Sequence, residues 1–72
     1  MNINYVIRDA SSLKYLCKDD YGKYYLGNCC GNVLEFTYKE EAESLIEDIV
    51  NEDIKVNLEI FEMIFEIVKI YA

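Results

Sequence analysis

The feature that most constrains the fold of this chain is a four-residue turn between two β-forming segments. In the first of these segments the side chains alternate as they do in a β-strand. The turn, Asp19-Asp20-Tyr21-Gly22, begins with an aspartate, whose side chain can accept hydrogen bonds from backbone amides. It ends with a glycine, which can adopt a positive φ angle. Residues 13–18 precede the turn and residues 23–27 follow it, so the pattern predicts an antiparallel β-hairpin.

Side chains in the first strand of this hairpin alternate with the period of a half-buried strand. Leu13, Tyr15 and Cys17 are expected on one face, and Leu16 is expected on the other face with its two neighbouring lysines. We interpret Cys17 as a small core hydrophobe, because free cysteine packs in this way.

Two more strands are predicted around the hairpin. Residues 3–8 are rich in β-forming side chains, and residues 33–36 read as a short strand that closes the sheet. Residues 9–12 form a turn between the first two strands, and residues 27–32 form a wide loop whose glycines permit left-handed backbone. The first half of the chain is thus expected to be a small antiparallel hairpin or meander over about 3–36.

Residues 38–50 are predicted to form an amphipathic helix. Thr37 and Glu40 fit a capping box, in which each side chain accepts a hydrogen bond from the backbone amide of the other residue. Residues 51–53 end the helix. Its apolar side chains recur with helical spacing on one face, opposite the acidic side chains. That apolar face comprises Ala42, Leu45, Ile46, Ile49 and Val50.

The C-terminal segment fits two structures. Apolar residues recur there at steps of three and four, which favours a helix over about 57–70. The β-branched and aromatic residues of Phe65–Tyr71 favour instead a final strand over 64–71, which is the alternative. The apolar residues with helical spacing are Leu58, Phe61, Phe65 and Val68.

The fold class expected from these elements is α+β, with the hairpin or meander packed on the helix of about 38–50. The chain of 72 residues makes a single domain, 1–72, with a small core. Hydrophobic residues make up 53% of the sequence, which is more than so small a body is expected to bury. We therefore expect a self-interface or a partner interface.

The residue types do not indicate a reaction. The sequence contains no histidine, so the commonest general base and metal ligand is absent. Its three cysteines include the adjacent pair Cys29 and Cys30, for which free thiols in a reducing compartment are expected rather than a disulfide or a zinc site. No catalytic residue, metal or cofactor is predicted, and a redox role for Cys29 and Cys30 is a separate hypothesis.

The net charge of −7 lies in one half of the chain. Residues 1–36 carry four acids and four bases, whereas residues 37–72 carry ten acids and three bases. A concentrated negative surface repels nucleic acid and attracts basic protein grooves, so direct nucleic-acid binding is not expected. An exposed helix face is also charged for solubility alone, and this interpretation stays open.

Several short segments resemble small proteins encoded by phages and prophages of AT-rich Gram-positive bacteria. Those proteins have a hairpin or meander followed by one helix, and often a final strand. The resemblance covers residues 5–50, and the small size and acidity are also similar to anti-CRISPR and other anti-defence proteins. The segments that carry it are Tyr5-Val6-Ile7-Arg8, Lys14-Tyr15-Leu16, Asp19-Asp20-Tyr21-Gly22, Phe36-Thr37, Glu40-Glu41-Ala42-Glu43 and Ile46.

Our first hypothesis for function is a non-enzymatic inhibitor of a host defence complex that handles nucleic acid. The partner is then a CRISPR effector or another nuclease, bound through its basic groove. The acidic helix and the tyrosine-bearing hairpin supply the contacts. The expected partner-binding residues are Glu40, Glu43, Glu47 and Asp48 on the helix, with Tyr21, Tyr24 and Tyr25 on the hairpin.

The alternative hypothesis is a homo-oligomeric structural or regulatory phage protein, for instance a homodimer. Its self-interface is expected at Leu58, Phe61, Phe65 and Val68, because their heptad-like steps form an apolar seam on a helix. Residues 1–5 lack a basic region followed by an apolar core, and no apolar run is long enough to span a membrane. We therefore expect a cytoplasmic protein of the bacterial host cell, with no membrane contact.

Overall fold

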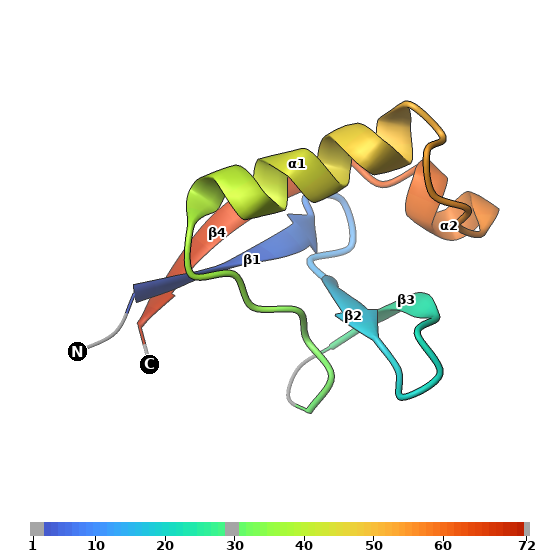
Figure 1. The fold of residues 1–72 in the computed structure, drawn as a ribbon. Coiled ribbons are helices and arrows are strands. Elements are labelled where there is room, and N and C mark those ends of the chain that lie inside the picture. The colour runs from blue at the N-terminus through green and yellow to red at the C-terminus, as the bar shows by residue number, and fades with distance from the viewer. Residues whose placement is uncertain (1–2, 29–30, 72) are drawn as a thin grey trace.

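The computed structural model describes residues 3–28 and 31–71, in which three strands are followed by two helices and a final strand (Figure 1). The strands form one antiparallel sheet in the order β3-β2-β1-β4, and α1 lies over β1 and β4. The expected α+β class is confirmed. The elements are β1 (Ile3–Asp9), β2 (Tyr15–Lys18), β3 (Tyr24–Gly27), α1 (Lys39–Val50), α2 (Leu58–Phe61) and β4 (Phe65–Tyr71).

The β2–β3 hairpin forms as the turn chemistry predicts. The Asp19 Oδ1 atom accepts hydrogen bonds from the backbone amides of Tyr21 and Lys23, both at 2.9 Å. Gly22 adopts φ +82°, which a residue with a Cβ atom rarely does. These local bonds fix the register in which Leu16 lies opposite Leu26.

The predicted division of β2 into two faces is present, but both faces carry a buried apolar residue. Leu16 is fully buried in the core cluster beside Ile7, and Cys17 is buried as well. Leu13 instead lies exposed in the preceding turn, with φ +63°. The core face of β2 is the one that carries Lys18, and Cys17 is buried as predicted on the other face, where it bridges to Val33.

Residues 33–36 make two isolated bridges rather than a strand. Cys17 bridges to Val33, and Tyr5 bridges to Phe36 through two hydrogen bonds of 2.8 Å. Strands β1 and β2 pair directly at Arg8 and Tyr15 alone, so the segment 33–36 lies between them where they diverge. The predicted element thus closes the sheet region without forming a regular ladder.

The glycines of the 27–32 loop serve two purposes. Gly31 adopts φ +74°, as expected. Gly27 does not need a left-handed backbone; a Cβ atom built on it would lie 3.0 Å from the Cys17 Sγ atom. Gly27 therefore permits close packing against Cys17. Cys29 and Cys30 lie outside the described residues.

Helix α1 confirms the predicted helix, but its N-terminal cap is one residue later than expected. Tyr38 is the N-cap residue, and its backbone amide donates to the Glu41 Oε1 atom at 3.0 Å. The capping box at Thr37 and Glu40 is therefore wrong. Glutamates occupy both 40 and 41, so a glutamate side chain can accept from the N-cap amide whether the N-cap is Thr37 or Tyr38. The extended backbone at Tyr38 makes Tyr38 the N-cap.

The C-terminal end of α1 has the hydrogen bonds of a Schellman motif. The amides of Glu52 and Asp53 donate to the carbonyl oxygens of Ile49 and Asp48 at 3.1 Å and 2.9 Å. Glu52 has φ +60°, at the position that glycine usually occupies in this motif. The residues predicted to end the helix do so.

The apolar face of α1 packs on the sheet as predicted, except at its end. Ala42 and Ile49 are fully buried, and Leu45 and Ile46 are half-buried. Val50 is 55% exposed, because it lies at the edge of the apolar stripe in the last helical turn. The buried core cluster joins the sheet to both helices and comprises Ile7, Leu16, Ala42, Ile49, Ile60 and Met63.

The helix predicted over 57–70 is wrong, and the alternative, a final strand, is confirmed. Helix α2 is a single turn, capped by the Asn57 side chain, which accepts from the Ile60 amide at 3.0 Å. Strand β4 then pairs with β1 along its full length, from Ile3 opposite Tyr71 to Asp9 opposite Phe65. The β-branched and aromatic residues of β4 favour this pairing over the helical spacing.

The four apolar residues expected to form a self-interface therefore do not share a helical face. Leu58 and Phe61 lie on α2 and are 67% and 45% exposed. Phe65 packs against the core, and Val68 lies on the opposite face of β4, directly across from Val6. A coiled-coil seam through these four residues is wrong, because the chain changes from helix to strand between Phe61 and Phe65.

Two substitutions in α2 distinguish the observed fold from a longer helix. Ile60→Ala should lower the free energy of unfolding by about 2–5 kcal/mol, because Ile60 is fully buried in the core. Leu58→Ala should change it by no more than about 0.5 kcal/mol, because the Leu58 side chain is mostly exposed. Urea denaturation of both variants checks this, and the reverse order would contradict the position of α2.

Candidate functional site

Acidic side chains line the outer surface of α1. Glu40, Glu43 and Glu47 are exposed, and Asp48 is half-buried. The apolar face of the same helix is fixed on the sheet, so these carboxylates project from a rigid element. On a helix, positions three and four residues apart are neighbours, with Cβ atoms about 5–6 Å apart. Glu40, Glu43 and Glu47 therefore form one continuous stripe, which we call the acidic stripe.

Asp48 does not belong to this stripe. It borders a shallow depression beside the stripe, together with Glu41 and Ser44, and Glu40 of the stripe lines the same depression. Phe36 and Leu45 supply the apolar part of that depression. Sequence reasoning grouped Asp48 with the stripe, although the spacing of Glu41, Ser44 and Asp48 by three and four residues marks these three as neighbours on the helix.

The three hairpin tyrosines do not form one contact surface. Tyr21 is 96% exposed at the hairpin turn. Tyr24 packs against the core, with the Lys18 ammonium 5.2 Å from its ring centroid. Tyr25 lies on the other face of the sheet, where its hydroxyl accepts from the Asn32 side chain at 3.0 Å. Adjacent residues of a strand point to opposite faces, so Tyr24 and Tyr25 cannot act together.

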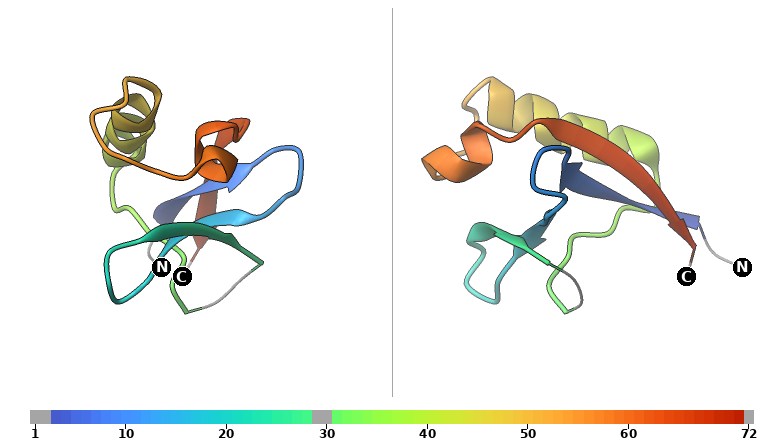
Figure 2. Two further views of the ribbon diagram at one scale, coloured as in Figure 1. Left: turned by 90° about the vertical axis from the view of Figure 1, so that its right-hand side faces the viewer. Right: turned by 180° about the vertical axis from the view of Figure 1, so that it is seen from behind.

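The hairpin and the acidic stripe lie on different parts of the molecule. In both views of Figure 2, the β2–β3 hairpin is on the side of the molecule away from α1. A single flat partner surface therefore does not contact the Tyr21 turn and the acidic stripe together. The predicted partner surface therefore separates into two parts, the exposed Tyr21 turn and the acidic stripe. The acidic stripe is the part that carries the charge.

An apolar groove lies between the C-terminal end of α1 and the turn of α2. Its volume is about 500 Å³, and it is partly open to solvent. Ile49 is buried at its base, whereas Leu58 and Phe61 are largely exposed. Sequence reasoning missed this α1–α2 groove, because it assigned Leu58 and Phe61 to a long helix. The lining residues are Ile49, Glu52, Ile54, Lys55, Val56, Leu58 and Phe61.

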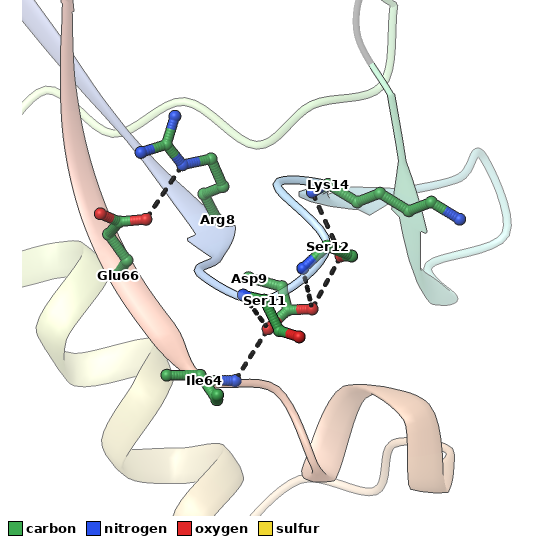
Figure 3. Close-up of polar contacts among 7 residues, drawn as sticks. All are labelled: Arg8, Asp9, Ser11, Ser12, Lys14, Ile64 and Glu66. Atoms are coloured by element: carbon green, nitrogen blue, oxygen red, sulfur yellow. Dashed lines mark hydrogen bonds and ion pairs between the residues drawn. The ribbon is translucent and has the colours of Figure 1, made fainter.

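The Asp9 carboxylate is the most strongly bonded side chain among the described residues (Figure 3). Its Oδ2 atom accepts from the Ser12 hydroxyl at 2.7 Å and from the Ser12 amide at 3.2 Å. Its Oδ1 atom accepts from the amides of Ser11 at 3.4 Å and Ile64 at 3.0 Å. The bond to Ile64 joins the β1–β2 turn to the residue that precedes β4.

These donors lower the pKa of Asp9 from its ordinary value of 3.8 to about 2, with the Ser12 hydroxyl making the largest contribution. A buried carboxylate with a shifted pKa is a common mark of a catalytic site. Here every donor comes from the chain itself, and a carboxylate with so low a pKa is a poor base near neutral pH. Asp9 therefore acts as a structural link.

Two other titratable groups are also structural. The Arg8 Nε atom donates to Glu66 Oε2 at 3.0 Å across the β1–β4 pair, and this bond raises the pKa of Arg8. Burial raises the pKa of the Cys17 thiol, so Cys17 is less readily ionised than an exposed cysteine. Neither group has the environment of an activated nucleophile or base.

Residues 3–28 and 31–71 contain no group of three or more histidine, cysteine or acidic side chains placed to hold a metal ion. Within the same ranges, no helix has the length and apolar character needed to cross a membrane. No protein-family model, curated protein or solved structure matches the chain. The resemblance to phage and anti-CRISPR proteins thus has no support from these comparisons and stays a prediction.

Replacing Asp9 with asparagine should lower the free energy of unfolding at neutral pH. It should also make that free energy less dependent on pH in the acid range. The folded pKa of Asp9 lies below its ordinary value, so Asp9 stabilises the fold fully above about pH 4 and loses this effect as the pH falls towards about 2. The stability difference between native protein and Asp9→Asn should therefore shrink over that interval.

Urea denaturation at several pH values measures this difference. Asp20→Asn is the matched control, since Asp20 is an exposed aspartate in the β2–β3 turn. It should retain the acid dependence of the native protein. A constant difference between native protein and Asp9→Asn from pH 7 to about pH 2 would show that Asp9 ionisation does not stabilise the fold.

Proposed function

We propose that this protein is a non-enzymatic inhibitor that binds a basic groove of a complex that handles nucleic acid, such as a CRISPR effector or another host nuclease in the bacterial cytoplasm. The acidic stripe of Glu40, Glu43 and Glu47 is the contact surface. Its continuity on a rigid helix is the observation that supports this proposal. Among the described residues we find no catalytic arrangement of side chains. The acidic stripe is the main charged feature of the described surface, so the proposal is built on it.

Electrostatic complementarity explains how such a stripe recognises its target. A groove that binds nucleic acid holds lysine and arginine side chains in positions that match a row of phosphates. A row of carboxylates at neighbouring helical positions offers the same sign of charge at a comparable spacing. Because α1 is already folded and packed, little conformational entropy is lost when it binds.

The stripe also argues against nucleic acid itself as the ligand. Residues 37–72 carry ten acids and three bases, and phosphates are repelled by this surface. In the other half, Lys18 is engaged with the Tyr24 ring rather than placed in a continuous basic row. A basic protein surface is therefore the favoured partner.

Self-association is a second candidate function, favoured by one observation. Strand β4 has seven residues at the end of the sheet order, and no described strand pairs with its outer side. An unpaired edge strand is a template for pairing with a second chain. Light scattering over a wide concentration range tests this proposal: a growing dimer fraction supports it, and a strict monomer excludes it.

Reversing the charge of the acidic stripe should weaken partner capture without unfolding the protein. Glu40→Lys, Glu43→Lys and Glu47→Lys combined should weaken binding by about tenfold or more at low salt, because attraction becomes repulsion. The tagged protein and this variant are used to capture proteins from bacterial lysate at low and high salt, with mass spectrometry of the bound fraction.

A second triple variant controls for the change in total charge. Asp20→Lys, Glu35→Lys and Glu62→Lys change the net charge equally at exposed positions outside α1. This control should retain a nuclease or effector subunit at low salt and release it at high salt, as the native protein does. Equal capture by the α1 variant would contradict the proposed function.

A further inference from the structure

The α1–α2 groove combines an apolar lining with an exposed position. Ile49 at its base is fully buried, and Ile54 and Val56 pack against the core, so the groove is part of the folded body. Leu58 and Phe61 stand at its border with 67% and 45% of their surface exposed. Large apolar side chains that remain exposed beside a groove are typical of a docking surface.

The chain segment that supplies most of the groove lining is acidic. Between residues 52 and 62 the chain carries four acids and one base, of which Glu52 and Lys55 line the groove itself. Neither α1 nor α2 has a basic residue in its last turn. The C-terminal end of a helix carries partial negative charge, so this end of α1 adds to the field of the carboxylates.

Glu52 places one of these carboxylates at the groove against its backbone preference. Its φ of +60° is a conformation that glycine or asparagine adopts more easily. A glycine would serve the Schellman motif better, and the side chain present lines the groove. A glutamate here therefore supplies a charge to the groove at a cost to the helix end.

We propose that the α1–α2 groove binds a basic amphipathic helix of a partner protein. The apolar side chains of that helix contact Leu58 and Phe61, and its lysine or arginine side chains face the surrounding carboxylates. Helix-in-groove recognition uses this combination of apolar anchors and flanking charge. The groove is separate from the acidic stripe, so this inference does not rest on the proposed function.

Charge also selects this occupant over a second copy of the chain. Each copy carries a net charge of −7, and the segments around the groove are acidic in both. Bringing two such surfaces together places like charges side by side, which opposes association. A basic helix instead neutralises the carboxylates while it covers the exposed leucine and phenylalanine.

A designed peptide provides the probe. It is about 16 residues long and amphipathic, with leucine at positions i, i+3, i+4 and i+7 on one face and lysine elsewhere. The control peptide has the same leucines and glutamate in place of lysine. Calorimetry measures both affinities, and amide chemical shifts in the labelled protein locate the site. We expect the lysine peptide alone to bind, with shift changes centred on residues 52–61.

Three variants test the contacts. Leu58→Asp should weaken the lysine peptide by about tenfold or more, because the apolar anchor is lost. Tyr21→Asp adds the same charge at the distant hairpin turn and should leave the affinity unchanged. Glu52→Gly should raise thermal stability, since glycine relieves the left-handed backbone, and yet weaken peptide binding about two- to fivefold.

Four results would overturn the proposal: no binding of the lysine peptide, equal binding of the glutamate peptide, shift changes confined to the acidic stripe, or a dimer that Leu58→Asp dissociates. The last result would make a second copy the occupant. The triple lysine variant of the acidic stripe should still bind the peptide through the groove. Failure of the proposed function therefore leaves this result unaffected, and the two failures are distinguishable.

Discussion

The pairing of β1 with β4 is the constraint on which the rest of the structure depends. The two strands come from opposite ends of the chain and pair along their full length. The Asp9 carboxylate fixes where this pairing begins, since it holds the Ile64 amide at 3.0 Å, and Asp9 itself lies opposite Phe65. The Ala10 amide adds a bond of 2.9 Å to the Ile64 carbonyl oxygen. With the start of β4 fixed, α2 must lie beside the end of α1, and the α1–α2 groove follows from that position.

The same pairing explains how so short a chain builds a core. In the middle of the sheet, β1 has β4 on one side and both β2 and residues 33–36 on the other. Ile7 therefore meets neighbours from every part of the sequence, including Leu16 and α1. A core made from such distant contacts forms only when the sheet is complete, so the small domain depends on one long-range register more than on local helix propensity.

Elements with local determinants were predictable from the sequence. The Asp19 and Gly22 turn, the two hairpin strands and the amphipathic pattern of α1 each follow from neighbouring residues. The structure of the C-terminal segment was not predictable in this way. The spacing of the apolar residues from Leu58 to Val68 fits a helix, whereas the decisive interaction of this segment is its pairing with β1, about 60 residues earlier. For the same reason the sequence could not show that Leu16 is buried, that Tyr24 and Tyr25 have separate surroundings, or that Leu58 and Phe61 border a groove. Of the candidate site, the acidic stripe was predictable and the groove was not.

The position of the acids is not explained by solubility alone. A helix gains stability from basic side chains in its last turn, yet α1 ends without one and continues into Glu52 and Asp53. Glu52 also occupies a backbone position that favours glycine. A surface selected only to remain in solution could mix both signs of charge and avoid these two costs. Acids placed where they weaken the helix end, beside apolar side chains left exposed, are the arrangement expected of a surface that meets a basic partner.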